Sequence, residues 1–304
     1  MKILLFGKNG QVGWELQRSL APLGELVALD SQDTYLPADF LDPDRLAETV
    51  RQVRPDVIVN AAAYTAVDRA ESEREAAHRV NALAPGVLAQ AAQACGAWIV
   101  HYSTDYVFDG SGATPWRETD PTGPLNVYGA TKREGEQRVI QACARHLVLR
   151  TSWVYAARGG NFARTMLRLA QERDRLSVVD DQCGAPTGAS LLADVTAHAL
   201  RTALERPALA GLYHVASGGE TTWHGYARHV LAFAQAQGVA LRATPDRVDP
   251  VPSSAYPAPA RRPANSRLDT RAFAAAFGLT LPEWRTGVDR MLAEILPAPQ
   301  RASG

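Results

Sequence analysis

The chain has 304 residues, enough for one large domain or for a large domain and a smaller one. Basic and acidic residues number 32 each, and no basic stripe indicates a nucleic-acid partner. The N-terminal apolar run is too short for a signal peptide, and no later run approaches the ~18 residues of a membrane span. Cys95, Cys143 and Cys183 lack the spacing of a disulfide framework or a zinc site. We therefore expect a cytoplasmic protein with neither nucleic acid nor membrane as partner.

The chain begins with a predicted strand that leads directly into a glycine-rich turn. Residues 2–6 are an apolar run typical of a buried parallel strand, and Gly7, Gly10 and Gly13 follow at intervals of three. A helix predicted over 11–23 would direct its free N–H groups at a pyrophosphate. Glycines also end strands for steric reasons alone, but their place between a strand and a helix favours dinucleotide binding.

Asp30 ends the next predicted strand, 26–29, about 20 residues beyond the glycine turn, where a carboxylate binds an adenosine ribose. The carboxylate would accept a hydrogen bond from an unmodified 2′-hydroxyl and repel a 2′-phosphate. Lys8 would offset part of that repulsion from within the glycine turn. We therefore expect that either NADH or NADPH serves as the cofactor.

Helices and strands continue to alternate as far as Thr151. The predicted elements are a helix over 43–53, a strand over 56–60, a long helix over 71–94 and a strand over 97–103. Asn81 lies within the long helix, where a polar contact between helices is expected in preference to a catalytic role. Five strands separated by helices predict an α/β fold, a doubly wound parallel sheet of the Rossmann-like kind.

The second half of the chain is less regular. Helices are predicted over 161–174, 189–205, 222–237 and 281–296, a strand over 211–216, and a long Pro-rich surface loop over 245–264. We expect residues 1–155 to form an NAD(P)-binding domain. Residues 156–298 would form a smaller, mainly substrate-binding α/β region, with some elements returning to the first sheet.

Tyr128 and Lys132 are the main candidates for catalysis. On a helix over 126–138 they lie one turn apart on the same face. The ammonium is expected to lower the pKa of the phenol from about 10 toward the working pH, where it donates a proton to a ketone best. Thr104 would add a second hydroxyl. Such a Tyr-x-x-x-Lys pair also occurs on solvated helix faces, but Lys occurs only at 2, 8 and 132, and Arg could not replace a compact ammonium that reaches both a phenol and a ribose.

Several runs of the sequence together resemble the dTDP-4-dehydrorhamnose reductase family of extended short-chain dehydrogenases/reductases. GKNGQVG and Tyr-x-x-x-Lys are common to the superfamily, whereas STDYVFDG, RTSWVY and TTWH are typical of this family. The resemblance extends from Lys2 to about Glu294. It implies NAD(P)H-dependent reduction of the C4 ketone of dTDP-6-deoxy-L-lyxo-4-hexulose to dTDP-L-rhamnose. That reaction is the final step of dTDP-L-rhamnose biosynthesis, which supplies lipopolysaccharide O-antigen.

The resemblance also implies roles for individual residues. At the cofactor these are Gly10, Gln11 and Val12, framed by Gly7 and Gly13, at the pyrophosphate; Asp30 at the ribose; Asp39 and Phe40 at the adenine; and Ala63, Tyr64, Thr65 and Tyr102 beside the nicotinamide. Tyr128 would be the proton donor, and Lys132 would bind the nicotinamide ribose and tune Tyr128. The residues at the substrate would be Thr104, Asp105, Trp153 and Arg262. A core position for Trp153 and a solvated Arg262 remain the alternatives.

Metal-dependent association is a separate question. Members of this family that dimerise through magnesium use a small set of glutamates, and Glu15 and Glu294 fit that pattern. Ser190 stands where another glutamate is expected, and two carboxylates are a poor cage for Mg²⁺. We therefore expect no metal and a monomer or weak homodimer, with Mg²⁺ at Glu15 and Glu294 as the alternative.

Two other functions stay open on this fold. One is a nucleotide-sugar epimerase or 4,6-dehydratase, and the other is a non-catalytic, cofactor-binding regulatory subunit. In the dehydratase branch the Thr is followed by Asp and Glu, whereas here Thr104 is followed by Asp105 and Tyr106. A phenol is a weak base for abstracting a proton from C5. The regulatory hypothesis requires that the catalytic Tyr, Lys or Thr be replaced, whereas Tyr128, Lys132 and Thr104 are all present.

Overall fold

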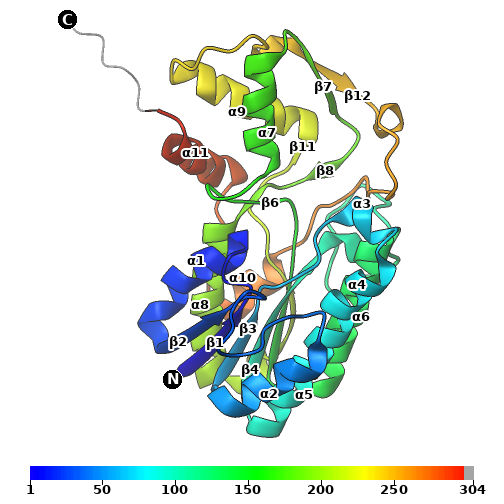
Figure 1. The fold of residues 1–304 in the computed structure, drawn as a ribbon. Helices are drawn as coiled ribbons and strands as arrows, with labels where there is room; N and C mark the ends of the chain where they lie inside the picture. The colour runs from blue at the N-terminus through cyan, green and yellow to red at the C-terminus, as the bar shows by residue number, and fades with distance from the viewer. Residues whose placement is uncertain (298–304) are drawn as a thin grey trace, which may run out of the picture.

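The structure, a computed structural model, describes residues 1–297 and has two lobes (Figure 1). The lobe that carries the N-terminus contains a six-stranded sheet between two layers of helices, and the second lobe is built around three helices. The predicted second region, 156–298, ends one residue beyond the described part. None of the helices in residues 1–297 is both long and apolar enough to cross a membrane.

The large sheet is parallel throughout. In chain order its strands are β1 (Lys2–Phe6), β2 (Glu25–Leu29), β3 (Val57–Asn60), β4 (Trp98–Thr104), β5 (His146–Thr151) and β10 (Gly211–His214). Their order in space is β10-β5-β4-β3-β1-β2, so the direction of winding reverses between β1 and β3. The predicted doubly wound sheet is confirmed, and so is the return of a later strand, β10, to it. At such a reversal the carboxyl ends of the strands diverge and leave room for a ligand.

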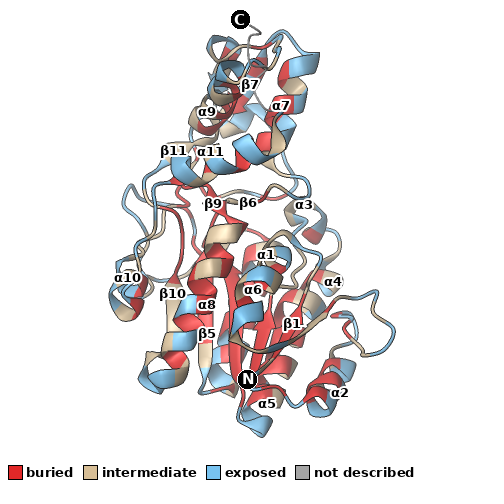
Figure 2. Ribbon diagram, turned by 90° about the vertical axis from the view of Figure 1, so that its left-hand side faces the viewer, coloured by how far each residue is buried: buried red, intermediate tan, exposed pale blue. Residues whose placement is uncertain are grey.

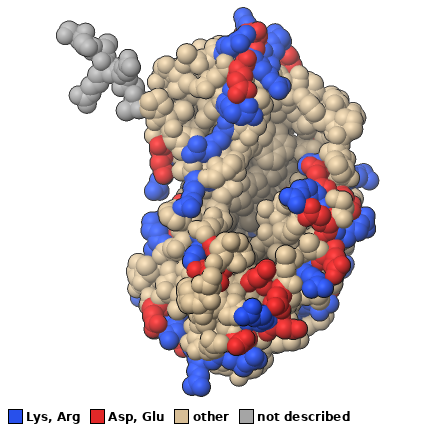
Figure 3. Space-filling view, in the orientation of Figure 1, with Lys and Arg blue, Asp and Glu red and all other residues tan. Residues whose placement is uncertain are grey.

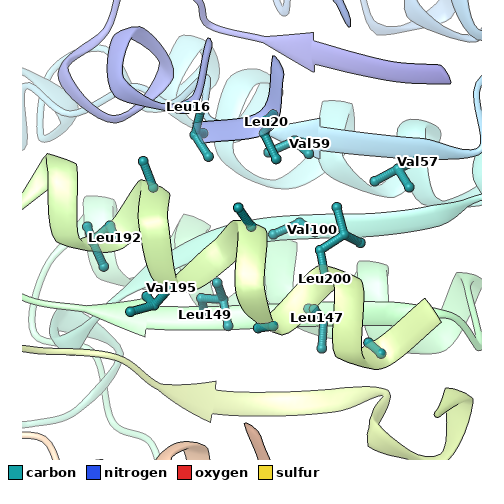
Figure 4. Close-up of a cluster of buried hydrophobic side chains, with 14 of the residues drawn as sticks. Leu16, Leu20, Val57, Val59, Val100, Leu147, Leu149, Leu192, Val195 and Leu200 are labelled. Atoms are coloured by element: carbon teal, nitrogen blue, oxygen red, sulfur yellow. The ribbon is translucent and has the colours of Figure 1, made fainter. Parts of the chain in front are cut away.

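Helices cover both faces of this sheet, which explains its continuous apolar strands (Figure 2). One face packs on α1 (Gln11–Leu20), α8 (Ala189–Glu205) and α10 (Arg271–Phe277). The other packs on α2 (Pro43–Val53), α5 (Ala84–Cys95) and α6 (Val127–Ala142). Figure 4 shows leucines of α1 and α8 meeting the valines and leucines of β3, β4 and β5. The α8 bounds match the prediction, whereas α10 was not predicted.

The predicted long helix over 71–94 is not regular. It begins at α4 (Arg74–His78), passes through a π-helical turn (Arg79–Leu83) and continues as α5; the short α3 (Val67–Ala70) precedes it. Pro85, near the start of α5, has no N–H to donate, which favours a local shift of the hydrogen-bond ladder. Asn81 is buried in the π-turn and bonds to the backbone N–H (2.8 Å) and carbonyl (3.1 Å) of Tyr64 and to Thr131 of α6 (3.2 Å). The predicted bridging role of Asn81 is confirmed.

The second lobe has its own core. Tyr226, Val230, Trp284 and Val288 lie at its centre, contributed by α9 (Trp223–Ala236) and α11 (Trp284–Ile295), and α7 (Phe162–Glu172) packs beside them. Three two-stranded sheets complete it and join it to the first lobe: β7 (Leu176–Val179) with β12 (Val248–Val251), β8 (Cys183–Gly184) with β11 (Thr221–Thr222), and β6 (Val154–Tyr155) with β9 (Thr187–Gly188). The prediction that 245–264 is entirely loop is therefore wrong. Pro250 obscured β12, but a proline is tolerated in a strand that pairs on one side only.

Short 3₁₀ turns follow several of these elements. Their bounds are Ala21–Leu23, Asp105–Val107, Pro207–Leu209, Pro245–Arg247 and Ser253–Ala255. The first of them continues α1 to Leu23, so the predicted helix over 11–23 changes its geometry at Pro22 and keeps its length.

A buried ion pair ties α6 to the sheet. Arg150 of β5 donates Nε and Nη2 to the two carboxylate oxygens of Glu136, both at 2.8 Å, and both side chains are almost fully buried. The Arg150 guanidinium also lies 5.0 Å from the ring centroid of Phe108 and 3.4 Å from His214 of β10. The pair therefore links α6, β5 and the returning strand β10.

Glu136→Gln should destabilise the fold by about 3–5 kcal/mol, because it leaves the Arg150 charge buried without a counter-charge. Urea unfolding of the purified variant measures this loss. The control is Glu172→Gln, which breaks the exposed pair between Arg168 and Glu172 and should cost less than about 1 kcal/mol. Equal losses of unfolding free energy in the two variants would show that the buried pair stabilises the fold no more than the exposed one.

Candidate active site

A cavity of about 940 Å³ opens between the lobes at the carboxyl ends of the sheet strands (Figure 3). Nearly all of its lining comes from the first 154 residues, and Trp223 is the contribution of the second lobe. The predicted residues that line it are Gly7, Gly10, Gln11, Val12, Asp30, Asp39, Phe40, Ala63, Thr65, Tyr102, Thr104, Asp105, Tyr128, Lys132 and Trp153. Gly13, Tyr64 and Arg262 were also predicted, but they lie outside the lining. Sequence reasoning missed Asn9, Ser31, Ser103, Tyr106, Thr151, Ser152 and Trp223, among others.

The glycine turn brings three backbone segments into close contact. Gly7 has φ +86°, and a Cβ there would lie 2.7 Å from the backbone nitrogen of Ala62. A Cβ on Gly13 would lie 2.0 Å from the carbonyl oxygen of Gly7, so Gly13 allows α1 to pack on the turn and does not face the cavity. The result is a helix N-terminus whose free N–H groups point toward the cavity, a favourable place for a phosphate group.

Asp30 lies on the cavity wall, as predicted, where Asn9 donates its side-chain N–H to the carboxylate. Lys8 does not face this wall. Its ammonium binds Asp33 at 2.7 Å, and that hydrogen bond raises the pKa of Lys8. Asp33 is therefore the main counter-charge of Lys8, and the expected attraction between Lys8 and Asp30 remains as a smaller effect that also raises the pKa of Lys8. What faces the cavity is a carboxylate and an amide, which suit ribose hydroxyls.

Tyr64 is turned away from the cavity. Its hydroxyl donates a 2.5 Å hydrogen bond to Glu73, and Asn81 holds its backbone from the other side. Its neighbours Ala63 and Thr65 face the cavity instead. The predicted contact between the Tyr64 side chain and the nicotinamide is not supported, because Glu73 supplies an acceptor on the opposite side.

Tyr128 and Lys132 project from the first turns of α6, which Asn126 caps by accepting a hydrogen bond from the Gly129 N–H at 2.8 Å. The Lys132 ammonium donates to the carbonyl oxygen of Tyr102 at 2.6 Å. Burial lowers the pKa of Lys132 to about 8, against the opposing charge of Glu136. Both predicted side chains thus reach the cavity, from a helix that begins one residue after its predicted start and ends at Ala142, four residues beyond its predicted end.

The pKa of Tyr128 differs from the prediction. Removal of the phenol from water raises its pKa to about 12, and the Thr104 hydroxyl offsets only part of that rise. The expected net lowering of the Tyr128 pKa is wrong in this structure, because desolvation dominates and the Lys132 ammonium is bound to the carbonyl oxygen of Tyr102. At neutral pH the phenol therefore retains its proton.

Asp105 is a buried acid beside these hydroxyls. It accepts a 3.1 Å hydrogen bond from Thr104, which also accepts one from the Tyr106 N–H at 3.2 Å. Burial raises the pKa of Asp105 to about 7. The Ser266 and Thr104 hydroxyls offset part of that rise, although within residues 1–297 the second carboxylate oxygen of Asp105 has no hydrogen-bond partner of good geometry.

Three further buried polar atoms on the cavity wall have no hydrogen-bond partner in the described part of the chain. They are Oε1 of Gln11, Oγ of Ser103 and Oγ1 of Thr151. Buried polar atoms of native proteins are nearly always bonded, so atoms of this kind on a cavity wall indicate a polar ligand. Their distribution, from the glycine turn to the end of β5, fits a long ligand such as a dinucleotide.

Trp153 faces the cavity, so the alternative of a simple core position is wrong. It is half-buried, and its ring stacks on that of Trp223 with centroids 3.8 Å apart and planes 15° apart. Trp223 begins α9, within the TTWH run that supported the resemblance. Its place at the cavity depends on a contact between lobes that the motif alone could not show.

Arg262 lies outside the cavity lining. Its guanidinium donates to both carboxylate oxygens of Asp68, at 2.7 and 3.1 Å, and this pairing raises the pKa of Arg262. The alternative of a freely solvated arginine is therefore wrong too. Tyr106, which does line the cavity, lies beside this pair and contributes to the same pKa shift.

Glu15 and Glu294, the alternative metal ligands, are placed as follows. The Glu15 carboxylate lies 3.6 Å from Nε of Arg18, and Glu294 is exposed on α11. Across residues 1–297 no three His, Cys, Asp or Glu side chains are placed to hold a metal ion together. Ser190 lies in the first turn of α8 and offers a hydroxyl where a metal site would need a carboxylate.

Comparison with known proteins gives consistent matches over the whole chain. A family model described as the RmlD substrate binding domain matches residues 1–296. The dTDP-4-dehydrorhamnose reductase of Salmonella typhimurium is 60% identical over 295 residues, which cover 97% of this chain and 98% of that protein.

Solved structures agree with these matches. The dTDP-4-dehydrorhamnose reductase of Clostridium acetobutylicum is similar with a TM-score of 0.88 and 34% identity, over 97% of this chain and 99% of that one. The Bacillus anthracis enzyme of the same name, in complex with NADP, has a TM-score of 0.85 and 34% identity, over 96% and 99% of the two chains.

Stability should depend on pH through Asp105. Its pKa is about 7 in the folded chain and ordinarily 3.8, so between these values the folded chain holds a proton that the unfolded chain releases. The contribution of this group to the free energy of unfolding therefore falls as pH rises through that window. Asp105→Asn cannot titrate, so its stability relative to the original chain should increase by about 2 kcal/mol from pH 5 to pH 7, with little further increase above pH 7.5.

Urea unfolding of both proteins at pH 5, 6, 7 and 8 measures this difference. A stability difference that stays constant over the four pH values would show that Asp105 titrates normally in the folded chain.

Proposed function

The chain belongs to the dTDP-4-dehydrorhamnose reductase family, and from this premise we propose how its residues carry out the reduction. The protein is an NAD(P)H-dependent oxidoreductase that reduces the C4 ketone of dTDP-6-deoxy-L-lyxo-4-hexulose to dTDP-L-rhamnose, the last step of dTDP-L-rhamnose biosynthesis. The observation that carries the proposed mechanism is the convergence of Thr104, Tyr128 and Lys132 on one wall of the cavity.

The cavity residues fit a nicotinamide dinucleotide, which supplies the hydride when bound. The N-terminus of α1, with Gly10, Gln11 and Val12, would hold the pyrophosphate. Asp30 would accept hydrogen bonds from the adenosine ribose, and the adenine would lie beside Asp39 and Phe40. The remaining predicted contacts, beside the nicotinamide, are Ala63, Thr65 and Tyr102.

Tyr128 is the proposed proton donor. Its phenol is protonated at neutral pH, and it would transfer that proton to the ketone oxygen as C4 becomes an alcohol carbon. The phenolate that remains is a buried anion, and the Lys132 ammonium one turn along α6 would stabilise it. Thr104 would turn its hydroxyl from Asp105 and donate a hydrogen bond to the same oxygen, so two hydroxyls would orient one carbonyl. The Lys132 ammonium would also bind the nicotinamide ribose.

Asp105 and Trp153 are proposed to contact the sugar: both line the cavity, and Asp105 lies close enough to Tyr128 to influence its pKa. Arg262 would attract the substrate diphosphate from beside Tyr106 while Asp68 holds its guanidinium in place. In this scheme the first 155 residues provide the cofactor site and the catalytic groups. The later region closes the sugar side through Trp223, while its α8, β10 and α10 pack on the first lobe.

The same residues argue against chemistry at C5. A 4,6-dehydratase needs a base there, and the residue after Asp105 is Tyr106, whose pKa burial raises well above its ordinary value. A phenol that keeps its proton cannot accept one. We therefore propose that one hydride and one proton are transferred at C4 and that C3, C5 and C6 remain untouched.

Tyr128→Phe should lower kcat by about 10²–10⁴-fold and leave cofactor affinity nearly unchanged, because only the proton donor is lost. Lys132→Ala should impair both. The measurements are NAD(P)H oxidation with dTDP-6-deoxy-L-lyxo-4-hexulose and calorimetric titration of the cofactor. A Tyr128→Phe variant with the original kcat would exclude this tyrosine as the donor.

NMR of the same reaction in deuterated water separates the reaction classes. The product should carry no deuterium at C5 beyond that of an enzyme-free control. Incorporation catalysed by the protein itself would support the epimerase or dehydratase hypothesis.

We also propose a cytoplasmic monomer or weak homodimer. Glu15 is engaged with Arg18, and position 190 offers a hydroxyl in place of a carboxylate, so two carboxylates alone would have to bind a divalent cation. Light scattering should therefore give the same mass with 5 mM MgCl₂ and with excess EDTA, at protein concentrations of about 1–100 μM. A dimer that dissociates on addition of EDTA would contradict this proposal.

A further inference from the structure

We propose that Trp223 is a positioning residue for the reduction: by stacking across the two lobes it holds Trp153 in the orientation that contacts the sugar. The inference rests on the proposed role of Trp153 in substrate binding. It assigns to the second lobe a specific part in fixing the sugar site, through a residue that touches Trp153 directly.

The backbone of Trp153 is held in an unusual conformation. Its φ is +50°, and within the described chain Arg54 is the only other non-glycine residue with positive φ. Arg54 ends a helix, where the left-handed conformation is common, whereas Trp153 lies in the connection between β5 and β6. For a bulky residue the left-handed conformation costs about 1–2 kcal/mol of conformational free energy, so it persists only where the surrounding structure enforces it.

Two neighbours restrain the indole of Trp153. The first is the Trp223 ring, nearly parallel to it at 3.8 Å between centroids. The second is the backbone of Gly184, so close that an added Cβ would lie 2.7 Å from Cε2 of Trp153. An aromatic stack contributes about 0.5–1.5 kcal/mol beyond simple burial, which is comparable to the strain that it must balance.

Trp223 is itself well fixed to the second lobe. Its indole N–H donates to Oε1 of Gln182 at 3.1 Å, and the Gln182 amide donates to Oγ of Ser253 at 2.8 Å. The Phe162 ring packs against it with centroids 4.6 Å apart. Thr222 caps the helix that Trp223 begins, by accepting from the Gly225 N–H. The stack therefore joins a rigid part of the second lobe to a strained residue of the first.

This arrangement predicts how the loss of Trp223 should act. Trp153 would relax from its strained conformation, so the sugar would lose an oriented contact while the cofactor and proton-donating residues stay in place. In Trp223→Ala the KM for the nucleotide sugar should rise about tenfold, with kcat changed less than threefold. The conservative Trp223→Phe, which keeps an aromatic face on Trp153, should retain most of the original KM.

A double-mutant cycle separates positioning from direct contact. The KM and kcat of Trp223→Ala, Trp153→Phe and the double variant are measured with dTDP-6-deoxy-L-lyxo-4-hexulose at saturating NADPH. If Trp223 acts through Trp153, the double variant should resemble the worse single variant; effects that multiply would overturn the proposal.

Two further variants complete the design. Trp116→Phe alters another stacked pair, with Phe108 at 4.6 Å, away from the cavity lining, and should leave KM unchanged. Gly184→Ala displaces Trp153 from its other side and should raise KM as Trp223→Ala does, with Trp223 intact. An unchanged KM in Trp153→Phe would refute the proposed role of Trp153, whereas a raised KM there with an unchanged KM in Trp223→Ala would refute the positioning role alone.

Discussion

The close approach of α6 to two neighbouring backbone segments is the constraint on which the site depends. A Cβ on Gly129 would lie 2.1 Å from the carbonyl oxygen of Tyr106, and a Cβ on Gly135 would lie 2.1 Å from that of Asn81. Only glycine permits contacts this close. They place α6 against the 3₁₀ turn that follows β4 and against the π-helical turn, and so direct Tyr128 and Lys132 into the cavity. The Glu136–Arg150 pair then fixes the next turn of α6 to β5.

Desolvation shapes the chemistry of the polar groups at this site. It raises the pKa of Tyr128 and of Asp105, which follows β4, and lowers that of Lys132, so each shift is toward the neutral form. The negative charge of Glu136 opposes this effect at Lys132. A phenol that holds its proton until a ketone accepts it is well suited to reduction. The same desolvation leaves Tyr106 unable to serve as a base, which separates this site from that of a dehydratase.

The two lobes contribute unequally to the cavity wall. The sheet of the first lobe brings together the ends of β1, β3, β4 and β5, and these supply most of the cavity wall. The second lobe contributes one aromatic side chain, Trp223, but anchors it firmly. In the described part of the chain, four side chains on the cavity wall carry a polar atom without a hydrogen-bond partner: Gln11, Ser103, Asp105 and Thr151. These atoms could bind a long polar ligand. On the proposed assignment, substrate and cofactor would meet in the cavity between the two lobes.

The sequence alone determined what depends on local pattern: the alternation of strands and helices, the glycine turn, the Tyr-x-x-x-Lys spacing and the full extent of α2 and α8. These follow from periodicity and turn chemistry within a few residues, and the family resemblance added the reaction. The tertiary structure decided what depends on partners distant in sequence. Asp33 neutralises Lys8, Glu73 draws Tyr64 away, Asp68 holds Arg262, and Trp223 meets Trp153. The pKa of Tyr128 belongs to the second group as well, because desolvation is a property of the packed fold and not of residue spacing.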